Sequence, residues 1–155
     1  MGKMNCETVW IEDVSFESSV RGHKVLMDAH KEFGGKDRGP TPKELLLTSI
    51  TGCSGMDVAS LLKKFRQPIK SFKMLADTHT TEGHPSVFAE VNISFVVEAG
   101  EGVEAEKVIK AVTSSMTKYC GVSAMIAEVC PIHFKVILNG TEIYAADASF
   151  QIPGF

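Results

Sequence analysis

The chain has 155 residues, of which 44% are hydrophobic and 23% charged, and its formal net charge at pH 7 is −3. This composition is typical of one globular domain, so we predict a single domain over residues 1–155. The 16 lysine and arginine residues are scattered along the chain. Nucleic-acid binding, which needs clustered basic residues, is therefore not expected.

The N-terminal sequence MGKMNCETVWIED has no apolar region of the signal-peptide type, and Cys6 stands where a myristoylation signal has Ser or Thr. The most apolar window, Leu45 to Leu62, carries Asp57 near its centre. A charged residue there favours a buried helix over a membrane span. We therefore expect a cytoplasmic protein without a membrane segment.

Residues from about 6 to 29 predict an antiparallel β meander of three runs, CETVWIED, VSFESSV and HKVLMDA. The Arg21-Gly22 pair between the last two runs suits a tight turn. The following EFGGKDRGPTP is rich in glycine, proline and charge, and predicts a loop.

A long helix is predicted over about residues 42–66. Thr41 can cap it, Pro42 suits the first helical position, and Glu44 completes a capping box with Thr41. The helix should end before Pro68.

Two strand-like runs, SFKMLADTHT and SVFAEVNISFVVE, predict a hairpin around residues 82–85. A second long helix is predicted over about 104–128, because apolar residues recur at helical spacing, with an interruption at Cys120-Gly121. HFKVIL and TEIYAA then predict another hairpin around an Asn139-Gly140 turn. The fold class is α+β, with hairpin-joined antiparallel strands and two long helices.

The chain contains four cysteines, Cys6, Cys53, Cys120 and Cys130. A reactive cysteine needs a helix N-terminus, a cation or a metal to favour its thiolate. Cys53 lies about 16 Å along its predicted helix, beyond the reach of the helix dipole, so its activation must come from another segment. Cys120 sits where a new helical run begins, and backbone amides of residues 121–123 can point toward its sulfur. The local setting of Cys120 is the better of the two.

Gly52 and Gly55 flank Cys53, and each costs about 1 kcal/mol relative to alanine inside a helix. They remove side chains around the sulfur, which suits close approach of a ligand or another segment. Equally, Cys53 is interpreted as a small core residue and the glycines as aids to helix packing. Spacing alone leaves both interpretations open.

The combined pattern is more specific than its parts. Residues 39–47, GPTPKELLL, are followed by Gly52-Cys53 and then by YCGVS at residues 119–123. This pattern resembles the OsmC/Ohr family of organic hydroperoxide reductases. The resemblance implies an intertwined homodimer of OsmC-like fold, with the two long helices at its centre.

The resemblance implies that Cys53 is a peroxidatic cysteine, which attacks an organic hydroperoxide and becomes a sulfenic acid. Cys120 would resolve it as a Cys53–Cys120 disulfide, which a dithiol, such as a lipoyl group, then reduces. By this resemblance the protein would be a peroxiredoxin-like antioxidant oxidoreductase of the oxidative stress response.

Peroxidase members of the family have glutamate directly after the helix-start proline, paired with an arginine from the meander. Here that position is Lys43, and Glu44 stands one place later. The sequence therefore looks closer to the YhfA-type branch, and a second hypothesis is a thiol-dependent binding or redox-sensing protein. Arg38 is a candidate cation for Cys53, with Arg21 a weaker one, and Asp57, one turn beyond Cys53, is a candidate pocket residue. Glu44 is interpreted first as a helix cap.

The five histidines show no standard metal spacing, and Cys130-Pro131-Ile132-His133 is only half of a zinc motif. We therefore predict neither a metal nor an organic cofactor. Cys6 and Cys130 lack the motif context of the other pair and are interpreted as structural or incidental.

Overall fold

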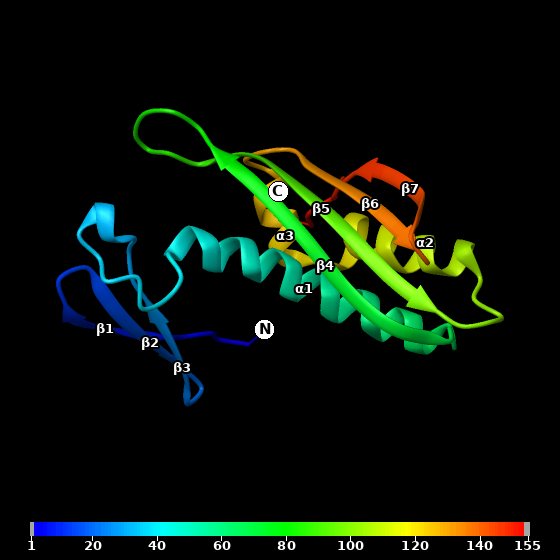
Figure 1. Cartoon of the computed structure of the whole chain (residues 1–155), viewed down its shortest axis with the longest axis horizontal. Coiled ribbons are helices and arrows are strands. Elements are labelled where there is room, and N and C mark those ends of the chain that lie inside the picture. The colour runs from blue at the N-terminus through cyan, green and yellow to red at the C-terminus, as the bar shows by residue number, and fades with distance from the viewer. Residues whose placement is uncertain (1, 154–155) are drawn as a thin grey trace. The chain divides into compact units, whose positions relative to one another are not determined.

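The computed structural model describes residues 2–153, which form two compact units with their boundary between Leu46 and Leu47. The N-terminal unit contains a three-stranded antiparallel sheet of order β1-β2-β3, made of β1 (Glu7–Glu12), β2 (Ser15–Val20) and β3 (His23–Met27) (Figure 1). The predicted meander is confirmed. Arg21 and Gly22 both have positive φ, 52° and 83°, as a tight two-residue hairpin turn requires.

The loop after β3 is organised around the carboxylate of Asp28. It begins with one 3-10 turn, η1 (Lys31–Phe33), and continues in an irregular path to the next helix. Asp28 accepts hydrogen bonds from the backbone N–H groups of Ala29, Lys36 and Arg38 at 2.9, 3.2 and 3.2 Å. This one side chain therefore ties both ends of the loop together.

The C-terminal unit contains a four-stranded sheet of order β4-β5-β6-β7. Its strands are β4 (Ile69–Thr80), β5 (Phe88–Ala99), β6 (Ile132–Leu138) and β7 (Thr141–Asp147). The pairs β4-β5 and β6-β7 are antiparallel, as the two predicted hairpins require. Asn139 and Gly140 have φ of 49° and 81°, which confirms the predicted turn between β6 and β7.

The pairing of β5 with β6 is parallel, with Val91 opposite Ile132 and Val97 opposite Leu138. The prediction of hairpin-joined antiparallel strands therefore describes each hairpin but not the contact between them. A parallel pair needs a long crossover connection, and the helical segment between β5 and β6 provides it. Hairpin signals are local in sequence and carry no information about which hairpins are neighbours.

Helix α1 (Pro42–Lys64) begins where the capping box predicts. The Thr41 N–H donates to Glu44 Oε2 at 2.7 Å, and the Glu44 N–H donates to Thr41 Oγ1 at 3.4 Å. The helix ends at Lys64, close to the predicted end near residue 66 and before Pro68.

The second predicted helix is three shorter segments. Helix α2 (Ala105–Ser114) continues into a π-helical turn, η2 (Ser115–Tyr119), and α3 (Gly121–Ala127) follows. Between them Cys120 has extended backbone angles, φ −71° and ψ 97°, so the predicted break is confirmed. The π-helical turn has no counterpart in the prediction.

The helices cover one face of the four-stranded sheet, which lies in front of them in Figure 1. Alternate residues of β5 point into the core and are buried, while α1 contributes Ile50, Val58 and Leu62. By length and composition α1 is the one described helix that could cross a membrane. The core helix of a soluble protein passes the same test, and Ile50, Val58 and Leu62 of α1 belong to the hydrophobic core.

Candidate functional site

Helix α1 places Cys53 and Asp57 one turn apart on the same side of the helix, and both side chains are partly buried. Between them, Ser54 is fully buried, and its hydroxyl donates to the Ile50 carbonyl at 2.8 Å. Ser54 therefore acts as a core residue of the helix, which leaves Cys53 and Asp57 as the candidate site residues of this stretch.

Cys120 lies at the junction of η2 and α3, and its side chain is fully buried. The Ser123 N–H donates to Cys120 Sγ at 3.3 Å, so the thiol occupies the N-cap position of α3. The predicted backbone donor to this sulfur is therefore present.

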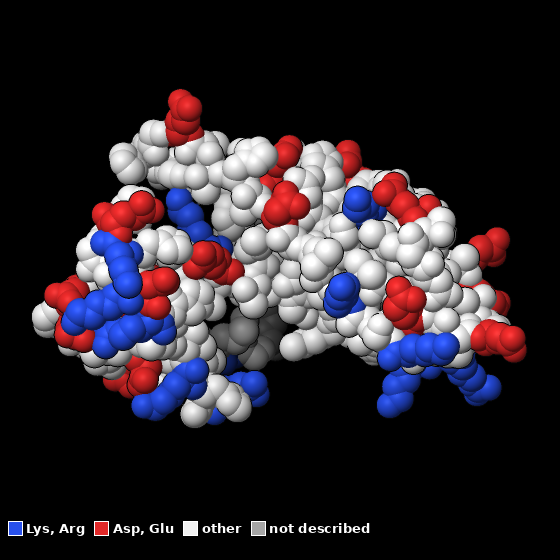
Figure 2. All heavy atoms as spheres, in the orientation of Figure 1, with Lys and Arg blue, Asp and Glu red and all other residues white. Residues whose placement is uncertain are grey.

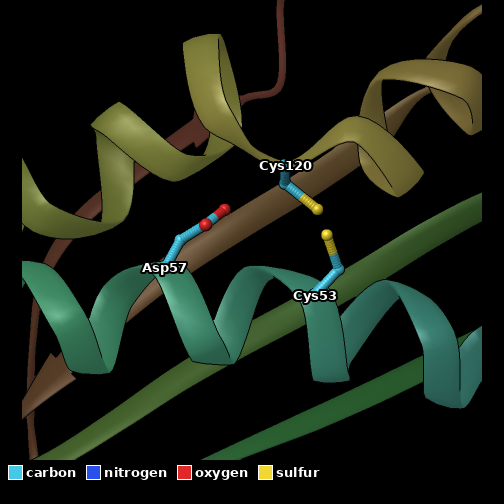
Figure 3. A group of neighbouring side chains, drawn as sticks. All are labelled: Cys53, Asp57 and Cys120. Carbon is cyan, nitrogen blue, oxygen red and sulfur yellow. The ribbon is translucent and has the colours of Figure 1, made fainter. Parts of the chain in front are cut away.

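Cys53, Asp57 and Cys120 converge although they come from distant parts of the chain. The two sulfur atoms and a carboxylate oxygen of Asp57 all lie within 4.8 Å of one another. Figure 3 shows the two sulfur atoms pointing toward each other and the Asp57 carboxylate beside them. All four cysteines are free thiols here.

Burial raises the pKa of the Cys120 thiol from its ordinary 9.0 to about 11. The Ser123 hydroxyl and N–H lower the pKa, and the nearby Cys53 thiol raises it further. The helix start at Cys120 therefore does not make this cysteine a ready thiolate, contrary to the expectation from its local setting. Desolvation by the surrounding core outweighs the backbone donor.

Asp57 connects α1 to the π-helical turn. The hydroxyl of Ser115, the first residue of η2, donates to Asp57 Oδ2 at 3.0 Å and is itself fully buried. Within residues 47–153 no lysine or arginine forms an ion pair with Asp57. The carboxylate thus stands beside two thiols without a cationic partner from its own unit.

Two of the three candidate residues of the N-terminal unit, Arg38 and Glu44, have partners within that unit. Arg38 pairs with Glu12 at 2.9 Å and with Asp28 at 3.6 Å. Glu44 caps α1 through Thr41, which confirms its plain interpretation. Figure 2 shows acidic and basic side chains interspersed over this unit. A role for Arg38, Arg21 or Glu44 toward Cys53 stays a prediction.

Gly52 and Gly55 have different surroundings. A Cβ atom built on Gly55 would lie 2.4 Å from Met74 Cε, so this glycine allows β4 to pack closely against α1. A Cβ atom built on Gly52 would meet nothing within 4 Å. Gly55 therefore serves close packing between α1 and β4. Gly52 instead leaves open space next to Cys53 in the helix.

Two serines of the site had no signal in the sequence as site residues. Ser115 depends on the π-helical turn, which brings its hydroxyl to Asp57. Ser123 lies in the first turn of α3, and its fully buried hydroxyl has no hydrogen-bond partner among residues 2–153. Cys130 lies in the core and Cys6 is exposed, and neither joins the cluster.

One cavity, about 580 Å³ in volume, is an open hollow on the sheet face away from the helices. Polar side chains of the four strands line it, among them His133, whose Nδ1 lies 2.6 Å from Asp147 Oδ1. The cavity includes none of the three clustered residues. Its paired, solvent-open groups offer no reactive centre, so the cysteine cluster is the better candidate site.

Comparison with known proteins finds relatives that are similar over most of the chain. Protein YhfA of Escherichia coli strain K12 is 33% identical over 124 residues, which are 79% of this chain and 89% of YhfA. A hypothetical protein from Aquifex aeolicus VF5, known from its crystal structure, is 32% identical with a TM-score of 0.75, and the match covers 90% of this chain and 99% of that one. The predicted likeness to YhfA-type members is confirmed.

An organic hydroperoxide resistance protein OsmC from Legionella pneumophila has a TM-score of 0.64 at 12% identity, over 88% of this chain and 98% of that one. At that identity the likeness concerns the fold alone. The family model described as OsmC-like protein matches residues 34–135, a segment that contains both Cys53 and Cys120. The chain therefore belongs to the OsmC-like family.

Proposed function

We propose that the protein is a cysteine-based peroxidase that reduces organic hydroperoxides to alcohols. The observation that carries the proposal is the convergence of the Cys53 and Cys120 sulfurs from separate elements. Two thiols in such proximity can form a disulfide after small side-chain movements, which a one-cysteine site cannot do.

Cys53 is the better first nucleophile because its side chain is partly exposed, while Cys120 is buried and its pKa is raised to about 11. The Cys53 thiolate attacks the terminal oxygen of ROOH, the O–O bond breaks, and the alkoxide takes up a proton and leaves as ROH. Cys53 becomes a sulfenic acid and is oxidised by two electrons.

Cys120 then attacks the sulfenic sulfur of Cys53. An S–S bond forms, the S–O bond breaks, and hydroxide leaves as water after taking up a proton. A dithiol returns two electrons and two protons and is itself oxidised to a disulfide. The sum is ROOH plus dithiol giving ROH, water and the oxidised dithiol, so no metal or organic cofactor takes part.

We further propose that the protein acts as a cytoplasmic homodimer. Free thiols suit a reducing compartment. In the single chain, 22% of the most apolar window of α1 is buried, and Met56 on this helix is 76% exposed. Apolar surface of this extent favours a covering partner, and a second copy is the one that the family resemblance implies.

A second candidate function is redox sensing or thiol-dependent ligand binding without rapid turnover. Lys43 directly after Pro42, together with the lack of a cation paired to Asp57 within residues 47–153, favours it. Such a protein would form the same disulfide but would react slowly with hydroperoxide.

The test follows the loss of cumene hydroperoxide with dihydrolipoamide as reductant. We expect turnover by wild type and by Cys130→Ser, a buried cysteine outside the cluster, and a fall of at least about 100-fold for Cys53→Ser. With one equivalent of hydroperoxide, mass spectrometry should show a disulfide that depends on both Cys53 and Cys120.

Wild-type turnover no faster than that of Cys53→Ser rules out the peroxidase. If the Cys53–Cys120 disulfide still forms in that case, the redox-sensing function is the one supported. If oxidation stops at a sulfinic acid on Cys53, resolution by Cys120 is ruled out as well.

A further inference from the structure

Cys53, Asp57 and Cys120 present two sulfur ligands and one oxygen ligand within 4.8 Å of one another. Zinc binds thiolate sulfur at about 2.3 Å and carboxylate oxygen at about 2.0–2.2 Å, so the ligand atoms of a tetrahedral site lie about 3.6–3.8 Å apart. Side-chain movements on the order of 1 Å would bring these three atoms to that separation. Three protein ligands leave a fourth position for water.

The charges of the cluster also favour a cation. None of the three side chains forms an ion pair with a lysine or arginine of residues 47–153. Metal binding releases the protons of both thiols, and the three ligands then carry three negative charges. A bound divalent cation would compensate most of that charge and would stabilise both thiolates directly.

Two buried serines surround the cluster in positions that suit a second layer of contacts. The Ser115 hydroxyl donates to Asp57 Oδ2, which fixes the carboxylate and leaves its other oxygen available. The Ser123 hydroxyl is fully buried and has no hydrogen-bond partner among residues 2–153. A metal-bound Cys120 thiolate would give it an acceptor.

We propose that the reduced protein binds one thiophilic divalent cation of the zinc class through Cys53, Cys120 and Asp57. The cation holds both sulfurs as thiolates, so its binding and formation of the Cys53–Cys120 disulfide exclude each other. Binding does not depend on peroxidase activity. The ligands come from two elements far apart in sequence, which explains why no metal spacing is visible in the chain.

The test is an anaerobic titration of the full, phosphine-reduced chain with Co²⁺, which gives a sulfur-to-metal charge-transfer band when bound to thiolates. We expect one Co²⁺ per chain, displaced by Zn²⁺. Cys53→Ser and Cys120→Ser should lose the band, and Asp57→Asn should bind at least about tenfold more weakly. Cys6→Ser and Cys130→Ser are the matched controls and should bind like wild type.

A second measurement needs no variant. With saturating Zn²⁺, alkylation of Cys53 by N-ethylmaleimide, followed by mass spectrometry, should slow at least about tenfold, because the metal blocks the sulfur. The exposed Cys6 should react at the same rate with and without Zn²⁺. The proposal is wrong if wild type gives no charge-transfer band or if Zn²⁺ leaves Cys53 alkylation unchanged. Neither measurement uses a hydroperoxide, so a failed peroxidase assay does not affect them.

Discussion

The carboxylate of Asp28 is 1% exposed, yet its pKa is lowered from the ordinary 3.8. Burial raises this pKa, but the backbone N–H groups of Ala29, Arg38 and Lys36 and the charge of Arg38 together lower it by more. At Cys120 burial prevails and the pKa is raised, because only one backbone N–H and one hydroxyl act against the burial of the whole side chain. The number of donors around a buried group thus decides which of its protonation states is stable.

We expect Asp28→Asn to lower the free energy of unfolding at neutral pH, because the amide cannot replace a charged acceptor of three N–H groups. The folded-state pKa is depressed, so this stabilisation is complete above about pH 3.8 and is lost as the pH falls through the folded value. Denaturant unfolding at a series of pH values should show the difference from wild type narrowing in acid. Asp37→Asn, an exposed carboxylate of the same loop, is the control, and a difference independent of pH would contradict the assignment.

At the scale of elements, α1 carries both glycines of its central stretch for different reasons. Gly55 leaves room for the side chain of Met74 on β4, whereas a side chain at Gly52 would meet no other atoms nearby. At the break in the second predicted helix, two neighbouring features likewise position two different side chains. The π-helical turn brings the Ser115 hydroxyl to Asp57. The extended backbone of Cys120, which follows this turn, points the Cys120 sulfur toward Cys53. Such turns are rare in helices and often occur at functional sites.

Gly52→Ala should stabilise the protein by about 0.4–1 kcal/mol, since the residue is helical and its Cβ has room. Gly55→Ala has the same effect on the unfolded chain but must displace the Met74 methyl group, so its gain should be smaller or become a loss. Denaturant midpoints of the two variants measure this difference. An equal gain at both positions would show that Met74 moves without cost.

At the scale of the whole molecule, the exposed apolar side chains matter most. Large hydrophobic residues are more than half exposed on both units, among them Trp10 at 62%, Met56 at 76% and Met125 at 63%. Large exposed apolar side chains on each unit favour a covering partner, which is the physical basis for proposing a second copy.

Sedimentation should therefore show wild type as a dimer at micromolar concentration. Met56→Asp should shift it toward monomer by at least about tenfold in dissociation constant, because a charge would be buried against the partner. Met4→Asp, at a residue that is 94% exposed near the N-terminus, is the matched control. A monomeric wild type would leave the apolar face of α1 to another partner.

The local elements were predictable from the sequence because their signals act over a few residues. Thr41, Pro42 and Glu44 predicted the start of α1, and Asn139-Gly140 predicted the last hairpin turn. The motif around Cys53 and Cys120 indicated the family, which the comparisons confirm. These features depend on backbone preferences and short hydrogen-bonding patterns, which the order of residues specifies directly.

Only the tertiary structure decided the properties that depend on contacts between segments far apart in the chain. The parallel contact of β5 with β6, the raised pKa of Cys120 and the approach of Asp57 to both sulfurs all depend on burial and on elements far apart in the chain. The sequence by itself indicated which cysteines are candidate reactive residues and where the helix is interrupted. The fold determined which of them meet and how their environment sets their charge, because desolvation and electrostatics act through space and not along the chain.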